Sequence, residues 1–139
     1  MNTITVLIAD DHAIVREGLR ALLATEPDIQ IVGEATNGQQ AVALSHKLVP
    51  DIVLLDLSMP LLNGMDAIPR IQQCTTASTK ILILSTYSDP AYARHAQSLG
   101  ASGYLSKQSD IHLIATAIRS IHSGDLYFSP THHLTVQCP

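Results

Sequence analysis

Five short apolar runs alternate with five segments of helical periodicity, and this alternation constrains the fold more than any other feature. The runs are Ile4–Ala9, Ile29–Glu34, Asp51–Leu55, Lys80–Leu84 and Ser102–Leu105. The first, third and fourth consist almost entirely of apolar residues, which is typical of parallel strands covered on both faces. The chain is therefore predicted to be an α/β protein with a (βα)5 doubly wound, five-stranded parallel sheet.

Capping residues and helix breakers set the expected limits of the helices. The first helix should bury a stripe of Val15, Leu19, Leu22 and Leu23. Pro69 lies inside the third segment and should delay, kink or shorten that helix. The expected helices start after Asp11 or His12, run from Asn37 to before Pro50, from Gly64 to Cys74, from Asp89 to Gly100, and from Ser109 or Asp110 to Gly124.

Composition and charge narrow the functional classes. Of 139 residues, 46% are hydrophobic and 14% are charged, so a folded core is expected. The net charge of −4 and the lack of a basic run argue against direct nucleic-acid binding by this domain. Two cysteines without CxxC spacing suit a reducing, cytoplasmic compartment, and we expect neither a signal peptide nor a membrane span. Residues 1–124 are expected to form one domain and 125–139 a linker or tail.

Polar residues follow four of the predicted strands where each strand ends. Asp10 and Asp11 follow the first strand and Asp56 follows the third. Ser85, with Thr86 beside it, follows the fourth, and Lys107 comes after the fifth. Ligands bind beyond the carboxyl ends of the strands in open α/β sheets. Three carboxylates, a hydroxyl and an ammonium are therefore predicted to converge at one edge of the sheet.

This set of groups suits phosphoryl chemistry. Clustered carboxylates repel one another unless a cation is present, and an all-oxygen set favours Mg²⁺. A carboxylate such as Asp56 can attack phosphorus, while Lys107 and Ser85 neutralise charge on the phosphoryl oxygens. Each residue alone also has an ordinary interpretation. Asp10 and Asp11 could cap a helix, Asp56 and Ser85 could form turns, and Lys107 could be a solvated surface residue.

The sequence resembles the response-regulator receiver domains of bacterial two-component systems, in particular the NarL/FixJ subfamily. The motifs that carry the resemblance are Ile8–His12, Val15–Leu19, Glu26–Ile29, Val32–Ala35 with Asn37-Gly38, Pro50–Pro60 and Gly100–Lys107. They cover the chain from about Ile4 to Gly124, and in this order and spacing they are highly specific. The resemblance implies a flavodoxin-like fold with strand order 2-1-3-4-5.

The resemblance also implies a role for each site residue. Asp56 would be the phosphoacceptor. Mg²⁺ would be bound by Asp11 directly, by Asp10 largely through water, by Asp56, and by the backbone carbonyl of Ser58. Lys107 would pair with a phosphoryl oxygen, and Thr86 would lie near the phosphoryl group. The switch residues would be Ser85 and Tyr104, although a strand tyrosine with its hydroxyl in water is the ordinary interpretation of Tyr104.

Some residues depart from the family pattern. Gln108 follows Lys107 where many receiver domains have a cis proline, which leaves the geometry of this loop open. Asn63 stands where Asp is common, and both residue types suit a turn. The seven histidines include no HxxxH pair with a supporting acid, so all are interpreted as surface or capping residues and not as metal ligands.

The implied function is a phosphorylation switch, not an enzyme. A sensor histidine kinase would donate the phosphoryl group, and the switch would control a LuxR-type helix-turn-helix domain, absent from this chain, and hence transcription. Slow self-dephosphorylation and homodimerisation on phosphorylation remain open, as do the kinase, the stimulus and the target genes. One alternative is a phosphatase of the haloacid-dehalogenase type, but Ser58 stands where that class needs a second acid. The other is a phosphorylation-independent interaction domain.

Overall fold

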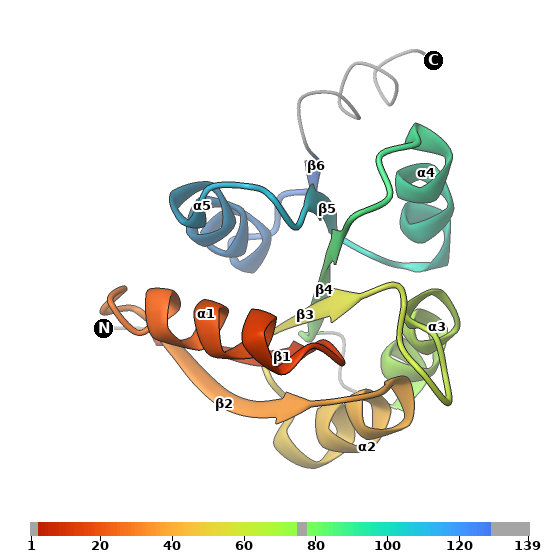
Figure 1. Ribbon diagram of the computed structural model, residues 1–139, viewed down its shortest axis with the longest axis horizontal. Coiled ribbons are helices and arrows are strands. Elements are labelled where there is room, and N and C mark those ends of the chain that lie inside the picture. The colour runs from red at the N-terminus through yellow and green to blue at the C-terminus, as the bar shows by residue number, and fades with distance from the viewer. Residues whose placement is uncertain (1–2, 75–77, 129–139) are drawn as a thin grey trace.

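The computed structural model describes residues 3–74 and 78–128, in which strands and helices alternate (Figure 1). The strands are β1 (Ile4–Ala9), β2 (Ile29–Ala35), β3 (Ile52–Asp56), β4 (Lys80–Ser85), β5 (Gly103–Ser106) and β6 (Tyr127–Phe128). The helices are α1 (Ala13–Leu23), α2 (Gly38–Leu48), α3 (Gly64–Cys74), α4 (Pro90–Leu99) and α5 (Ile111–His122). The first five strands lie within one residue of their predicted limits.

The strands form one parallel sheet in the order β2-β1-β3-β4-β5-β6. The predicted flavodoxin-like order is confirmed for the first five strands, but the expectation of a five-stranded sheet is wrong. The order reverses direction at β1, which has β2 on one side and β3 on the other. A binding crevice is expected at such a reversal, beyond the carboxyl ends of the strands.

The sixth strand comes from a segment that the sequence assigned to a linker or tail. Tyr127 and Phe128 pair in parallel with Gly103 and Tyr104 of β5. Phe128 packs against the hydrophobic cluster on one face of the sheet and Tyr127 against the cluster on the other. This pairing covers an edge of β5 that would otherwise leave backbone groups unpaired. The rest of the expected tail, residues 129–139, lies outside the described residues.

Two layers of helices cover the sheet. In Figure 1, α2, α3 and α4 lie on one side and α1 and α5 on the other. Side chains pack into a separate hydrophobic cluster on each side of the sheet. The interiors of β3 and β4 are buried on both faces, which explains why their sequences are continuously apolar.

The helices begin and end close to their predicted limits. Asp89 caps α4 by accepting a hydrogen bond from the Ala91 N–H, and Gly100 ends the helix in the left-handed region. Pro69 does not shorten α3, which keeps its predicted limits. In α1 only Leu23 is fully buried, and Leu22 is 50% exposed, so the predicted apolar stripe is only partly used for packing.

No helix among residues 3–74 and 78–128 is both long and apolar enough to cross a membrane.

The sheet register brings the polar strand ends to one level. Asp56, the last residue of β3, pairs with Leu84, and Ser85, the last residue of β4, pairs with Ser106 at the end of β5. Asp10 directly follows β1, and Lys107 directly follows β5. The parallel architecture therefore places these side chains at the same edge of the sheet.

Gly64, the first residue of α3, provides a test of this arrangement. A Cβ atom on Gly64 would lie 2.1 Å from the Asp56 carbonyl oxygen, so Gly64→Ala must push the start of α3 away from the end of β3. We expect a loss of about 1–3 kcal/mol in the free energy of unfolding, measured by urea denaturation.

Gly18→Ala is the matched control, because nothing lies within 4 Å of the added Cβ in α1. This variant should gain roughly 0.5–1 kcal/mol from helix propensity. Equal stability of Gly64→Ala and the wild type would show that the close approach of α3 to Asp56 is not rigid.

Candidate functional site

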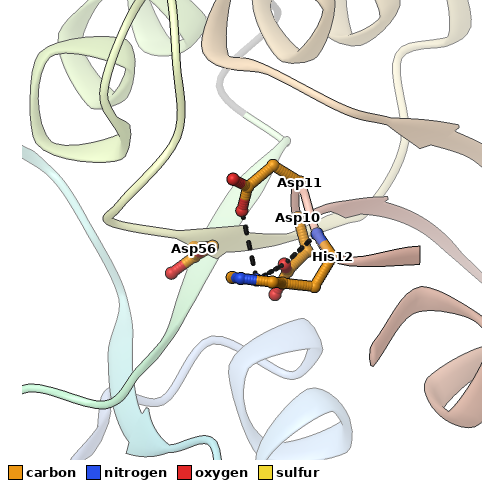
Figure 2. A group of neighbouring side chains, drawn as sticks. All are labelled: Asp10, Asp11, His12 and Asp56. Atoms are coloured by element: carbon orange, nitrogen blue, oxygen red, sulfur yellow. Dashed lines mark hydrogen bonds and ion pairs between the residues drawn. The ribbon is translucent and has the colours of Figure 1, made fainter. Parts of the chain in front are cut away.

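Four polar residues lie together at the carboxyl ends of β1 and β3: three consecutive residues after β1 and the last residue of β3. Carboxylate oxygens of Asp10, Asp11 and Asp56 and a ring nitrogen of His12 all lie within 4.8 Å of one another (Figure 2). Asp10 and Asp56 are buried, with 3% and 4% of their surface exposed, whereas Asp11 and His12 are exposed. The predicted convergence of the three carboxylates is confirmed in position.

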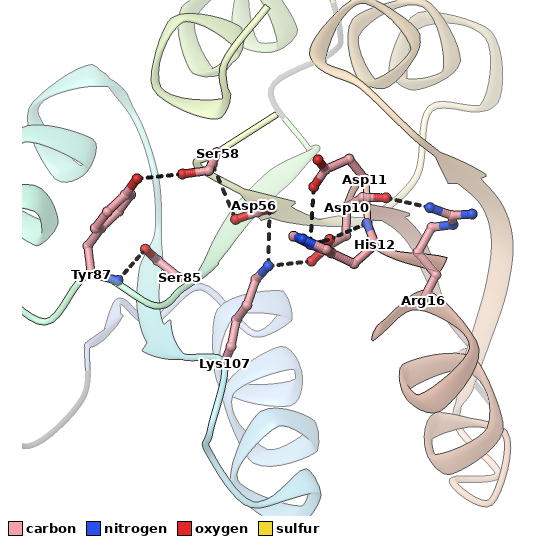
Figure 3. A network of polar contacts seen from close by, with 9 residues as sticks. All are labelled: Asp10, Asp11, His12, Arg16, Asp56, Ser58, Ser85, Tyr87 and Lys107. Atoms are coloured by element: carbon pink, nitrogen blue, oxygen red, sulfur yellow. Dashed lines mark hydrogen bonds and ion pairs between the residues drawn. The ribbon is translucent and has the colours of Figure 1, made fainter. Parts of the chain in front are cut away.

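Lys107 reaches into this cluster from the end of β5. Its Nζ lies 2.8 Å from Asp10 Oδ2 and 3.1 Å from Asp56 Oδ2 (Figure 3). Burial alone would lower the pKa of Lys107, but the hydrogen bond to Asp10 and the charges of Asp56 and Asp10 outweigh it and raise the pKa. The described residues contain no cis peptide bond, so the Lys107–Gln108 bond is trans and Lys107 still reaches both acids.

The two oxygens of Asp56 have different surroundings. Oδ1 accepts a hydrogen bond from the Ser58 N–H at 3.3 Å. Oδ2 is buried and has no aligned hydrogen-bond partner in the described part of the chain, although Lys107 Nζ is close enough for an ion pair. Burial raises the pKa of Asp56, the charge of Asp10 raises it further, and Lys107 offsets part of the rise. Oδ2 is thus a buried carboxylate oxygen that is not committed to a hydrogen bond.

Ser85 ends the strand next to that of Asp56, and Tyr87 connects Ser85 to Tyr104. Ser85 is buried, and its Oγ accepts a hydrogen bond from the Tyr87 N–H at 2.9 Å (Figure 3). Tyr104 is fully buried and its hydroxyl donates to the Tyr87 carbonyl at 2.8 Å, so the interpretation with a hydroxyl in water is wrong. Burial raises the pKa of Tyr104, and hydrogen bonding with Ser85 opposes this rise. Thr86 is exposed beside this group.

Sequence reasoning missed three residues around the site. The prediction that His12 is a surface or capping residue is confirmed for its exposure but not for capping, and its ring nitrogen contacts Asp10 and Asp11, which the sequence did not predict. The Arg16 guanidinium donates a hydrogen bond to the Asp10 carbonyl at 2.7 Å and so connects α1 to the end of β1. The Tyr87 hydroxyl lies 2.7 Å from Ser58 Oγ and so connects the loop after β4 to the loop after β3. Adjacency to Asp11 was a signal for His12, whereas nothing local marked Tyr87.

A cavity of about 630 Å³ lies beside the cluster, between the loop after β3 and α4. Its walls are mainly apolar and include Met59, Met65 and the stacked rings of Tyr87 and Tyr92, whose centroids are 4.8 Å apart. The carboxylates and Lys107 do not line it. The acid cluster is therefore the better candidate for chemistry, because buried titratable groups with shifted pKa values converge there.

The cluster fits a hard divalent cation. Three carboxylates face one ammonium, so negative charge is in excess, and Asp56 Oδ2 is a buried oxygen that has an ion-pair contact with Lys107 but no aligned hydrogen bond. Such an oxygen set suits Mg²⁺. Ser58 also lies beside the cluster, because its N–H is bound to Asp56. A phosphoryl group placed next to Oδ2 would meet Lys107 on one side, and Ser85 lies at the end of the next strand.

The raised pKa of Asp56 gives a prediction about stability. A carboxyl whose folded-state pKa exceeds its unfolded value contributes stability at low pH that is lost as the pH rises through the folded-state pKa. Asp56→Asn cannot ionise and avoids this loss. In buffer without divalent cations, we expect it to be more stable than the wild type by about 1–3 kcal/mol at neutral pH, with a smaller difference at mildly acidic pH.

Urea denaturation at the two pH values measures this difference. Asp125→Asn is the control, since Asp125 is exposed after α5, and it should change stability little at either pH. A gain for Asp56→Asn that grew as the pH fell would contradict the sign of the pKa shift.

Known proteins are similar to this chain in sequence and in fold. The chain is 38% identical over 135 residues to the transcriptional regulatory protein DegU of Brevibacillus brevis, covering 96% of this chain and 57% of that protein. A LuxR-family response regulator from Aurantimonas superposes with a TM-score of 0.90 at 36% identity, covering 96% and 94% of the two chains. The isolated receiver domain of RcsB from Salmonella enterica, solved with the phosphomimetic BeF₃⁻, gives 0.85 at 26%, covering 96% and 98%.

The match also defines how much of a known protein the chain represents. The chain spans about 57% of the length of the curated relative DegU. Residues 6–119 match the family described as the response regulator receiver domain, and this range contains all the strand-end residues of the cluster. The chain therefore belongs to the response regulator receiver domain family.

Proposed function

We propose that this domain accepts a phosphoryl group on Asp56 from a phosphohistidine of a sensor kinase. The observation that carries the proposal is Asp56 Oδ2, a buried carboxylate oxygen without an aligned hydrogen bond and 3.1 Å from Lys107 Nζ. In the transfer, Oδ2 forms a bond to phosphorus while the bond from phosphorus to the histidine nitrogen breaks. The leaving nitrogen keeps the electron pair of that bond.

The residues around Asp56 support transfer through positioning and charge. Receiver domains bind Mg²⁺ in general, and here Asp10, Asp11, Asp56 and the Ser58 backbone carbonyl would hold it. A bound cation would neutralise part of the negative charge on the phosphoryl oxygens. Both oxygens of Asp10 already have partners in His12 and Lys107, which supports a role for Asp10 through water and a direct one for Asp11.

Lys107 would pair with an oxygen of the phosphoryl group. Its Nζ contacts Asp56 Oδ2, so a phosphoryl group on that oxygen would bring new anionic oxygens close to the ammonium. The ion pair with Asp10 holds Lys107 in place before transfer. Electrostatic preorganisation of this kind needs no movement of the ammonium at the moment of transfer.

Ser85 and Tyr104 are proposed as the switch residues, with Thr86 as a neighbour of the phosphoryl group. Both switch side chains are bonded to the backbone of Tyr87, so a shift of Ser85 toward the phosphoryl group would be felt in the loop before α4. The free energy by which phosphorylation shifts the two-state equilibrium equals the difference between the contact free energies of the phosphoryl group in the two states. This coupling would carry the phosphorylation signal to α4 and β5.

The proposed role is that of a stoichiometric acceptor, not a catalyst of turnover, with slow self-dephosphorylation as the only hydrolysis. Ser58, two residues after Asp56, carries no acid that would protonate a leaving group. The relative DegU is named as a transcriptional regulatory protein. In a longer protein, residues 1–124 would control a LuxR-type DNA-binding domain and so transcription in the cytoplasm, with residues 125–139 as part of the connection and dimerisation on phosphorylation as a further step.

Intact-mass analysis after treatment with acetyl phosphate and Mg²⁺ tests the acceptor. We expect the wild type to gain the mass of one phosphoryl group and Asp56→Asn to gain none, because an amide cannot act as the nucleophile. Asp66→Asn is the matched control, since Asp66 is exposed in the first turn of α3 and should not affect the yield.

Adducts of equal yield on the wild type and Asp56→Asn would show that the acceptor is wrong. Amide spectra of the same samples test the switch. The proposal expects resonances from Ser85 to Tyr104 to shift on modification, and an adduct that leaves them unchanged would refute the switch while leaving the acceptor intact.

A further inference from the structure

We propose that β6 is the output strand of this domain: its pairing with β5 depends on the position of Tyr104, and a phosphoryl group on Asp56 loosens that pairing. The phosphoryl part of the inference rests on the proposed function, whereas the link between Tyr104 and β6 does not. Since β6 is the last described element, a change in its pairing acts directly on the chain after residue 128.

A short backbone ladder attaches β6 to the sheet (Figure 1). Tyr127 and Phe128 pair in parallel with Gly103 and Tyr104, and the Tyr127 N–H donates a hydrogen bond to the Ser102 carbonyl at 2.9 Å. Among the described strands, every other pairing is longer. Local stability depends on the number of backbone bonds and buried contacts, so a short ladder opens at low cost. The pairing of β6 is therefore the easiest in the described sheet to change.

Side-chain packing connects β6 to the surroundings of Tyr104. Phe128 is half-buried and packs against the hydrophobic cluster that contains the buried Tyr104 ring. Leu126, just before β6, is exposed, so packing begins only at Tyr127. A Cβ atom on Gly103 would lie 2.5 Å from the Tyr127 carbonyl oxygen, which shows how closely the two strands approach. The position of β6 is thus determined by the residues of β5 with which it pairs.

Tyr104 also connects β5 to the candidate site. Its hydroxyl donates a hydrogen bond to the Tyr87 carbonyl at 2.8 Å, and the Tyr87 N–H donates to Ser85 Oγ at 2.9 Å (Figure 3). Ser85 ends β4, the strand that pairs with the strand ended by Asp56. Two hydrogen bonds and one strand pairing therefore join Ser85 to β6 through a single buried side chain.

The hydrogen bond of Ser85 sets the direction of the effect. Its hydroxyl oxygen accepts the Tyr87 N–H in the unmodified chain. A phosphoryl group on Asp56 offers acceptor oxygens for the hydroxyl proton, and a Ser85 side chain that turns toward them leaves the Tyr87 N–H. The Tyr87 carbonyl then moves with its loop, and Tyr104 loses its fixed acceptor. Movement of Tyr104 displaces the backbone that pairs with Phe128, so the pairing of β6 is weaker in the phosphorylated form.

Amide hydrogen exchange on the whole chain tests the link to Tyr104 without any phosphoryl group. Tyr104→Phe removes the hydroxyl donor and keeps the ring, and the Tyr127 amide should exchange roughly 2- to 12-fold faster, the factor that one hydrogen bond is worth. Amides of β3 should keep their rates, which separates local opening from a loss of global stability. Tyr92→Phe is the matched control, because it removes a hydroxyl from an exposed ring stacked on Tyr87 and should leave the Tyr127 rate unchanged.

Beryllofluoride with Mg²⁺ tests the link to the phosphoryl group. Its binding to the wild type should speed exchange of the Tyr127 amide by a similar factor. Coupling between two sites is reciprocal, so a variant with weakened β6 pairing should bind beryllofluoride more tightly. Phe128→Ala removes the packing side chain of β6, and its affinity should rise by roughly 2- to 12-fold. Leu126→Ala changes an exposed side chain next to β6 and should keep the wild-type affinity.

The outcomes separate this inference from the proposed function. Equal exchange of the Tyr127 amide in the wild type and Tyr104→Phe, or a rate increase that extends equally to β3, overturns the role of β6. Exchange that is unchanged or slower with beryllofluoride bound, or equal affinity of Phe128→Ala and the wild type, also overturns it while Asp56 remains the acceptor. If beryllofluoride does not bind the wild type, the proposed function fails, and Tyr104→Phe still decides whether β6 depends on Tyr104.

Discussion

The crowding of Asp10, Asp11 and Asp56 at the carboxyl ends of β1 and β3 is the constraint on which the rest of the site depends. Parallel strands bring their carboxyl ends to one edge, so the acids are forced together by the same hydrogen-bonded ladder that builds the sheet. Lys107 relieves part of this repulsion through its contacts with Asp10 and Asp56. The remaining negative charge favours a cation at the site. The pKa of Asp56 is raised mainly by burial and then by the charge of Asp10.

Burial of the apolar sheet offsets the unfavourable free energy of holding these carboxylates together. β3 and β4 are buried throughout, and the hydrophobic clusters on the two faces hold their ends in register. Gly64 allows α3 to start against the Asp56 carbonyl, and Arg16 holds the Asp10 carbonyl from α1. A rigid frame of this kind can keep Asp56 Oδ2 buried without a hydrogen bond. The loop containing Tyr87 is exposed, as are Asp11 and His12, and its backbone is hydrogen-bonded to both proposed switch residues.

Much of this arrangement could be predicted from the sequence, because it follows from periodicity and from strand ends. Ile52–Leu55 is apolar throughout and Asp56 ends it, so both the strand and its polar end are visible in one dimension. β6 could not be predicted in this way, since two residues have no period and their pairing depends on the open edge of β5. His12 and Tyr87 were missed because their partners are set by side-chain direction and by a contact across 29 residues of sequence between Ser58 and Tyr87.

The account depends most on the three carboxylates acting together on one cation, and the Mg²⁺ dependence of stability tests this directly. A ligand that binds only the folded state raises the free energy of unfolding by about 2.7 kcal/mol at about 100 times its dissociation constant. We expect that gain for the wild type at saturating Mg²⁺, and its loss in both Asp11→Asn and Asp56→Asn. The same gain in all three proteins, or none in the wild type, would contradict the account.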